Sequence, residues 1–478
     1  MPRVYVMPNT IGALELHGVR GRVKDMPQRL LSLTLVLPHG LGSAYAAAYL
    51  NKLPETVHSL ALDASQCQAN LADLALPARL RTLRLTHLRE LPALPTSLTS
   101  ITLESCSLRG IVQLPPSVTN ANLSETWCRV DNFAQTSVAV MGSNLCRLRL
   151  TGLQPTWAVP PLPQGLTDLH IDFKSFYHSL SPGFTVALTV LPQSLEVLTL
   201  SCGFGGLNFT LGALPYSLRT LDTTHFLNFN SALGQLPDSL THLSLGWGFY
   251  HALGALPAGL MELRFAGNFN RPLGTLPPSL RVLDLHQCCR FNHPLGCLPR
   301  ALRQLRLGAV FNQPLLLRHA SLPAVHGQQA ATQALGARLA ADPLQPTPGA
   351  LVRLPETLAV LHIGEAFDHP LGPLPKSLTQ LRVGRCCCDC RFSHALGPLP
   401  AALRVLQLGV CAAYNHALNR LPDALRELRV FGAFDQPLPQ LPACLEVLAL
   451  GDAFDQTCRR RCRERCASCT WGTASTRR

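Results

Sequence analysis

One ten-residue phrase returns about every 20 to 23 residues along most of the 478-residue chain. Its clearest copies read Leu-Pro-x-Ser-Leu-x-x-Leu-x-Leu and occupy residues 191–200, 236–245 and 276–285. A fixed period of this length is typical of a solenoid, in which each repeat is one structural unit stacked on its neighbours. Such a stack presents a long surface instead of a single enclosed pocket.

Nineteen copies of the phrase align, and the spacing within each one predicts a strand and a turn. The alternating Leu-x-Leu end predicts a short strand with one buried face. The proline has a fixed φ and no N–H donor, which predicts a turn on the opposite side of the coil. We expect the small serine to hydrogen-bond within that turn. The copies begin at Met7, Met26, Leu53, Leu76, Leu94, Leu114, Met141, Leu162, Leu191, Leu214, Leu236, Leu256, Leu276, Leu298, Leu354, Leu374, Leu399, Leu421 and Leu441.

A second phrase, Phe-Asn-x-Pro-Leu-Gly, follows the predicted strand in the later repeats. Copies begin at Phe269, Phe291 and Phe311, and some repeats replace the asparagine by aspartate, as at Asp368. Stacked repeats would place the phenylalanines in one column. The asparagines would form a second column that bonds backbone groups of adjacent coils. We expect weaker rungs at the aspartates, because an ionised carboxylate accepts hydrogen bonds but does not donate them.

Together the two phrases resemble the FNIP repeat, a variant of the leucine-rich repeat named for its Phe-Asn-Ile-Pro block. The resemblance is strong over about residues 190–457, whereas residues 1–160 match mainly through the Leu-Pro phrase. It implies an α/β-type repeat solenoid, mostly β and irregular, with one strand per coil in a curved, leucine-rich-repeat-like parallel sheet. About 19 coils of 20–23 residues are expected. Repeat families of this kind specify architecture far better than activity.

Two regions depart from the period and set the expected domain organisation. The step from Leu298 to Leu354 is 56 residues long, so we expect residues 316–350 to leave the solenoid, with a short helix around Leu335 and Leu339. Residues 458–478 contain seven arginines and one glutamate, a net charge of +6. We therefore expect a solenoid over residues 1–457 and a basic, Cys/Arg-rich, disordered tail over 458–478.

Bulk composition excludes several classes of protein. Hydrophobic content of 47% and charged content of 14% exclude a disordered chain. The formal net charge is +13, but the tail holds a large part of it, so the whole-chain charge overstates the case for nucleic-acid binding. No secretory signal and no membrane-spanning apolar run are present, which predicts an intracellular, cytoplasmic protein with reduced thiols.

The sequence offers little that could support catalysis, and we expect no enzyme activity and no cofactor. G-x-S-x-G, P-loop, H-E-x-x-H and dinucleotide-binding motifs are all absent. Four tail cysteines with C-x3-C-x3-C-x2-C spacing are a weak zinc site, against the simpler interpretation of a disordered tail. Histidines recur beside the Phe-Asn block, and we interpret them as a repeated surface rung. The tail cysteines are Cys458, Cys462, Cys466 and Cys469, and the histidines are His251, His293, His369, His394 and His416.

The residue inside each Leu-x-Leu should face solvent on the concave side of the sheet. Seventeen of these nineteen residues are polar or charged, which supports a single register. We predict a non-catalytic protein-interaction scaffold whose concave face binds a protein partner, in particular an acidic segment. The alternatives are a solvated surface without a partner, a nucleic-acid-binding face and metal binding by the tail, and self-association stays open. The predicted partner-binding residues are Arg264, Arg306, Arg382, Arg429, His362 and Asp284.

Overall fold

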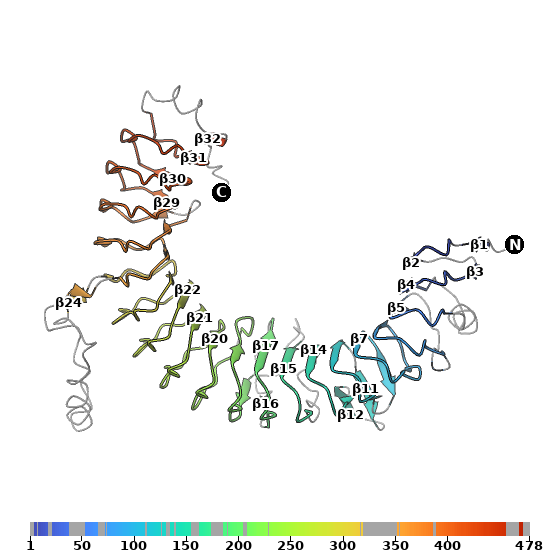
Figure 1. The fold of residues 1–478 in the computed structure, drawn as a ribbon. Coiled ribbons are helices and arrows are strands. Elements are labelled where there is room, and N and C mark those ends of the chain that lie inside the picture. Colours follow the sequence, from blue (N-terminus) through green and yellow to red (C-terminus); the bar gives the residue numbers. More distant parts are fainter. Residues whose placement is uncertain are drawn as a thin grey trace, which may run out of the picture. The chain divides into compact units, whose positions relative to one another are not determined.

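A computed structural model gives the fold, and it divides the chain into two compact units, Met1–Ser231 and Ala232–Arg478. Each unit is a stack of coils that contribute parallel strands lying side by side (Figure 1). Within the described residues, no helix has the length and apolar character needed to cross a bilayer. The structure describes residues 4–6, 8–17, 22–37, 53–65, 72, 74–109, 112–125, 127–130, 134–137, 140–153, 162–173, 185–188, 190–203, 208–227, 229–315, 317–318, 351–352, 354–385, 389–455 and 468–471.

In the first unit, one parallel sheet runs through successive coils, and small sheets lie along other sides of the stack. Every pairing in the main sheet joins the middle residues of neighbouring Leu-x-Leu phrases, as in Ala61 with Arg84. The main strands are β2 (Ala13–His17), β4 (Ser32–Val36), β5 (Ser59–Asp63), β6 (Thr82–Thr86), β7 (Ser100–Glu104), β10 (Asn120–Ser124), β14 (Arg147–Leu153), β15 (Asp168–Phe173), β17 (Val197–Cys202) and β19 (Thr220–Asp222). The small sheets comprise β1 (Val4–Val6) with β3 (Arg22–Asp25), β8 (Ser107–Arg109) with β11 (Trp127–Val130) and β12 (Ala134–Ser137), β9 (Val112–Gln113) with β13 (Val140–Met141), and β16 (Thr185–Leu188) with β18 (Asn208–Leu211).

The second unit contains a parallel sheet of the same kind. Its last strand comes from the C-terminal segment, where Ser468 pairs with Val447 and Cys469 with Leu448. Other residues of 458–478 lie outside the described part, so the disordered tail stays a prediction there. The main strands are β20 (His242–Leu245), β21 (Glu262–Gly267), β22 (Val282–Cys288), β23 (Gln304–Arg306), β26 (Val360–Ile363), β27 (Gln380–Val383), β29 (Val405–Cys411), β30 (Glu427–Gly432), β31 (Val447–Leu450) and β32 (Ser468–Trp471), and the short strand β28 (Asp389–Cys390) pairs with β29.

The Leu-Pro phrase forms the same turn in all nineteen copies. In each, the residue at the fifth position donates its N–H to the carbonyl three residues earlier, as Leu240 does to Pro237 at 3.0 Å. The turn directly precedes the strand, so the expectation of a turn on the opposite side of the coil is wrong. The serine also differs from expectation, because the hydroxyl of Ser194 donates to the Leu166 carbonyl of the preceding coil at 2.7 Å. Proline and serine thus shape and connect the coils at one edge.

The Phe-Asn block forms two columns in the second unit, as the sequence predicts. Nine aromatic rings stack in order with centroids 6.0–6.3 Å apart, namely those of Phe249, Phe269, Phe291, Phe311, Phe367, Phe392, Tyr414, Phe434 and Phe454. Beside them, Oδ1 of Asn292 accepts the backbone N–H of Asn312 at 2.8 Å. Oδ1 of Asp368 accepts the N–H of Ser393 at 3.0 Å. The rung needs only an acceptor, so the expectation of weaker bonds at aspartate is wrong.

The long step after Leu298 leaves the stack undisturbed. Strands β23 and β26 pair directly, with Arg306 beside His362, although 56 residues separate them. The rings of Phe311 and Phe367 stack at 6.3 Å across the same junction. Two short strands, β24 (Leu317–Arg318) and β25 (Leu351–Val352), pair antiparallel where the chain leaves and returns. The helix expected around residues 335–339 lies outside the described residues, and the excursion of 316–350 as a domain feature stays a prediction.

Candidate functional site

The six predicted partner-binding residues lie in one row across the sheet of the second unit. The register pairs Arg264 with Asp284, Asp284 with Arg306, Arg306 with His362, and His362 with Arg382. Gln407 separates Arg382 from Arg429. We call this series, from Arg264 to Arg429, the strand row. The alternating burial of Leu-x-Leu brings these side chains together, because both flanking leucines point into the core.

Carboxylates compensate three of the four arginines in the strand row. Arg264 lies 2.8 Å from a Glu262 oxygen and 3.8 Å from Asp284. Arg306 lies 3.4 Å from the same Asp284 carboxylate, and the Arg429 Nε lies 2.6 Å from Glu427. Arg382 has neither an ion pair nor a side-chain hydrogen bond to any residue in the described part of the chain. The guanidinium of Arg382 is therefore the uncompensated charge of the row.

A hollow of about 270 Å³ adjoins this arginine at the C-terminal ends of β23, β26 and β27. Arg385 spans one side of it, 3.3 Å from a Glu365 oxygen and 3.3 Å from Nε2 of His286. Glu365 and Arg385 follow their strands, and His286 lies in β22 beyond the Leu-x-Leu phrase. Strict alternation no longer determines side-chain direction at these places, so periodicity could not identify the three residues. The hollow is lined by His286, Leu307, Ala309, His362, Ile363, Gly364, Glu365, Arg382, Gly384, Arg385 and Gln407.

Three buried nitrogen atoms have no hydrogen-bond partner among the described residues; two belong to His362 and Arg382, which line the hollow, and the third to Arg306 on the adjacent strand. They are Nε of Arg306, Nε2 of His362 and Nε of Arg382, which come from consecutive strands. Burial, together with the neighbouring positive charges of Arg382 and Arg306, lowers the pKa of His362 from 6.5 to about 4. The His362 ring is therefore neutral at pH 7. Buried polar atoms usually have partners, so three unsatisfied nitrogens in one place indicate a site that can accept a ligand.

Glycines shape the wall of the hollow. A Cβ atom on Gly364 would lie 2.0 Å from the carbonyl oxygen of Gly308 in the preceding coil. Gly384 has a φ of +70°, and a Cβ atom there would lie 2.8 Å from Sγ of Cys390. Both positions need glycine, one for close approach of two coils and one for its backbone conformation. The glycines that follow β23, β26 and β27, namely Gly308, Gly364 and Gly384, are the sequence signal that could have pointed to this place.

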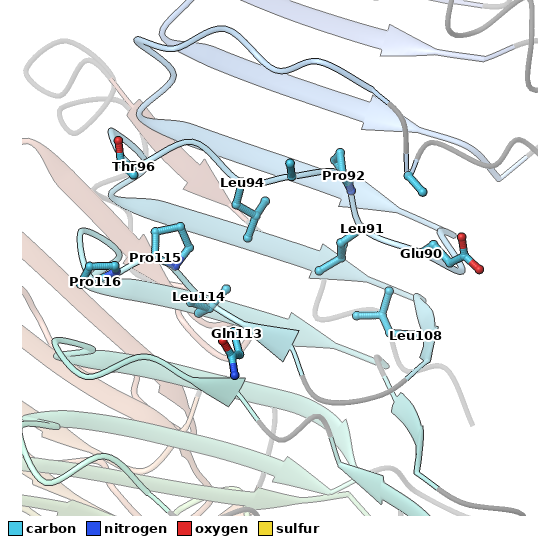
Figure 2. Close-up of a pocket in the computed structure, with 12 residues that line it drawn as sticks. Glu90, Leu91, Pro92, Leu94, Thr96, Leu108, Gln113, Leu114, Pro115 and Pro116 are labelled. Carbon is cyan, nitrogen blue, oxygen red and sulfur yellow. The ribbon is translucent and has the colours of Figure 1, made fainter.

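A larger hollow, of about 720 Å³, lies in the first unit. Figure 2 shows Leu91, Leu94, Leu108 and Leu114 around it, with Pro115 and Pro116 at one side. Glu90 is the only titratable residue in its lining. This lining supplies apolar contact but no set of groups suited to acid–base or nucleophilic chemistry.

The other candidate residues from the sequence are the recurrent histidines and the tail cysteines. The recurrent histidines form a rung, since Nε2 of His293 lies 3.3 Å from the Asn270 carbonyl and Nε2 of His394 lies 3.2 Å from the Asp368 carbonyl. Cys469 is in β32, whereas Cys458, Cys462 and Cys466 lie outside the described residues. Where the structure describes the chain, no three His, Cys, Asp or Glu side chains are arranged to hold a metal ion. Zinc binding by the tail stays an untested alternative.

Comparisons with known proteins identify the fold. No protein-family model matches the chain, and no curated protein matches it. The solved structure of CroV588, described as a circular LRR protein, matches 90% of this chain with a TM-score of 0.58 and 23% identity. This chain spans 61% of that protein's length. The fold is therefore a leucine-rich-repeat-like parallel solenoid.

Two further solved structures match at lower TM-scores. YopM from Yersinia enterocolitica WA-314 is 22% identical over 93% of this chain and 92% of its own, with a TM-score of 0.47. The LRR protein LIC12759 of Leptospira interrogans is 16% identical over 98% of this chain and 100% of its own, with a TM-score of 0.37.

Proposed function

We propose that the chain is a non-catalytic protein-interaction scaffold of the FNIP type that binds an acidic protein segment along the strand row. The observation that carries the proposal is the uncompensated guanidinium of Arg382 among side chains of alternating charge. Repeat solenoids use extended surfaces of stacked strands for binding. An acidic segment lying across the strands could meet Arg264, Arg306, Arg382 and Arg429 in succession.

The charge pattern favours a protein segment over nucleic acid. Asp284 lies within the row and pairs with the arginines on both sides of it, which breaks the continuous positive track that a phosphate backbone needs. The row residues from Arg264 to Arg429 include no Phe, Tyr or Trp on which bases could stack. An acidic peptide, in contrast, can place its own carboxylates opposite the arginines and leave a gap at Asp284.

Charge reversal tests this proposal. In the test variant, Arg264, Arg306, Arg382 and Arg429 are all replaced by Glu in the full chain. The matched control reverses four exposed arginines of the same unit outside the row, Arg290, Arg300, Arg404 and Arg420. A third protein ends before Cys458. Binding of a synthetic Glu/Asp-rich peptide is measured by calorimetry, alongside a duplex DNA of matched charge.

We expect the reversed row to weaken peptide binding at least ~10-fold, since each charge-assisted contact contributes about 1.5–3 kcal/mol. The control and the shortened chain should bind as the native chain does. Equal loss in the control, or loss only on removal of the tail, would place binding elsewhere. If DNA binding remains where peptide binding is lost, and its affinity falls steeply as salt is added, the nucleic-acid alternative is favoured. The intracellular location, the absence of a cofactor and self-association stay predictions from sequence.

A further inference from the structure

We propose that the hollow between Arg382, His362 and Arg385 binds one oxyanion, a carboxylate or a phosphate group, and acts as the anchor point of the strand row. The inference deepens the proposed function and rests on it only for the identity of the molecule that carries the anion. It specifies one class of ligand and one binding position, whereas the proposed function depends on charge distributed along the strand row.

The arrangement of donors carries the inference. Nε of Arg306, Nε2 of His362 and Nε of Arg382 belong to β23, β26 and β27, which are adjacent in the sheet and paired in register. Neighbouring strands are about 4.8 Å apart. An oxyanion has several lone pairs and can accept hydrogen bonds from more than one such donor at once. His362 and Arg382 line the hollow, so a ligand oxygen there would satisfy nitrogen atoms that the described residues leave unpaired.

The balance of charge indicates an anion and excludes a cation. Of the two carboxylates near the hollow, Glu365 pairs with Arg385 at 3.3 Å, and Asp284 pairs with Arg306 at 3.4 Å. Each of these acids is therefore compensated by an arginine, and Arg382 leaves one net positive charge. The neutral rings of His286 and His362 add none at pH 7, since burial lowers the pKa of both. A metal ion would face guanidinium groups with no carboxylate left to bind it.

The size of the hollow limits what enters it. Its volume of about 270 Å³ lies just below the ~300–1,000 Å³ of sites that enclose drug-sized ligands. One acidic side chain, one phosphorylated side chain or a chain terminus fits this volume, and the rest of the partner must lie outside along the row. The backbone at Gly364 and Gly384 fixes the wall, because neither residue can be replaced without a clash.

His362 supplies a direct readout of occupancy. The charged and titratable groups that act on its ring are Arg382 of β27, Arg306 of β23, and His286 and Asp284 of β22. An anion bound beside the ring favours its protonated form, so occupancy must raise the His362 pKa above its value of about 4 in the empty site. By linkage, the affinity for the anion rises as the pH falls from the His362 pKa of the occupied site toward that of the empty site.

The test titrates the full chain with sodium phosphate and, separately, with sodium acetate at constant ionic strength, and follows the His362 ring nitrogens by NMR. We expect saturable shifts and a raised His362 pKa for one or both anions. Whichever binds more tightly identifies the phosphoryl or the carboxylate source. Arg382→Gln should weaken binding at least ~10-fold. Arg382→Lys, which keeps the charge but not the planar fork, should give intermediate binding. The control Arg404→Gln, outside the row, should bind as the native chain does.

Two outcomes would overturn the inference: no saturable shift at His362 with either anion, or equal affinity in the native chain and in folded Arg382→Gln protein. Circular dichroism of each variant confirms folding, and Arg382→Lys keeps the test valid if the glutamine variant fails to fold. If phosphate or acetate binds at His362 but charge reversal of the strand row leaves binding of the acidic peptide unchanged, only the proposed function is rejected. If charge reversal abolishes peptide binding but neither anion binds at His362, only the anchor site is rejected.

Discussion

At the scale of single residues, one side-chain oxygen connects several coils of the second unit to the coil that follows. Asp368 is such a residue, since its Oδ1 accepts the N–H and the hydroxyl of Ser393 at 3.0 and 2.8 Å. Burial opposes its ionisation, but these hydrogen bonds outweigh burial and lower the pKa of Asp368. Asp368→Ala should cost about 1–2 kcal/mol of unfolding free energy in urea titrations. Asp368→Asn keeps the acceptor and should stay within about 0.5 kcal/mol; equal losses in both variants would disprove the rung.

His362 sets a pH dependence that can be measured without any ligand. Its folded-state pKa of about 4 lies below the ordinary 6.5, so the unfolded chain binds the proton more readily. The stability supplied by the neutral ring is complete above pH 6.5 and is lost as the pH falls toward 4. We expect roughly 2 kcal/mol over this range, less than the full shift implies because the ring is only part-buried. The difference in unfolding free energy between native chain and His362→Gln should follow this curve, and a flat difference would contradict it.

At the scale of the element, the aromatic column is the packing spine of the second unit. Phe291 is 0% exposed, and its ring stacks on Phe269 and Phe311 with centroids 6.1 Å away on each side. Phe291→Ala should lose about 3–5 kcal/mol. Phe291→Leu, which fills more of the space, should lose clearly less. Hydrogen exchange should show that the loss of amide protection is concentrated in the coils on either side of Phe291, since repeats contact only their neighbours. Uniform loss of protection across the unit would contradict this expectation.

The strands, the presence of a turn at each Leu-Pro and the aromatic column could be predicted from sequence because each depends on a position that recurs, whereas the place of the turn in the coil was predicted wrongly. Leu240, Leu260 and Leu280 occupy the same place in successive coils, so one correct register determines all of them. The hollow could not be predicted in this way. It depends on the uncompensated guanidinium of Arg382, and on Arg385 reaching back to His286 from a coil 99 residues later. Ion pairing and side-chain direction beyond the strand end vary from coil to coil, and periodicity contains no information about them.

At the scale of the whole molecule, the stack tolerates a large interruption. Strand β23 pairs directly with β26, so the sheet is continuous across the junction. Arg318 and Leu351 are antiparallel partners, so a two-residue hairpin turn such as Asn-Gly can join them. Replacing 319–350 by that turn should change the unfolding free energy by less than about 1 kcal/mol, as measured by urea unfolding. A loss of several kcal/mol would show that the removed segment packs against the coils.

The antiparallel pairing of β24 and β25 also makes this junction suitable for the insertion of a second domain. A fluorescent domain spliced between Arg318 and Leu351 would begin and end at neighbouring backbone positions, so its fold would not force the flanking coils apart. The coils on either side hold Arg306 and His362, and His362 lines the hollow. The fluorescence of a domain inserted there would therefore report on ligand binding in the adjoining coils from within the same polypeptide.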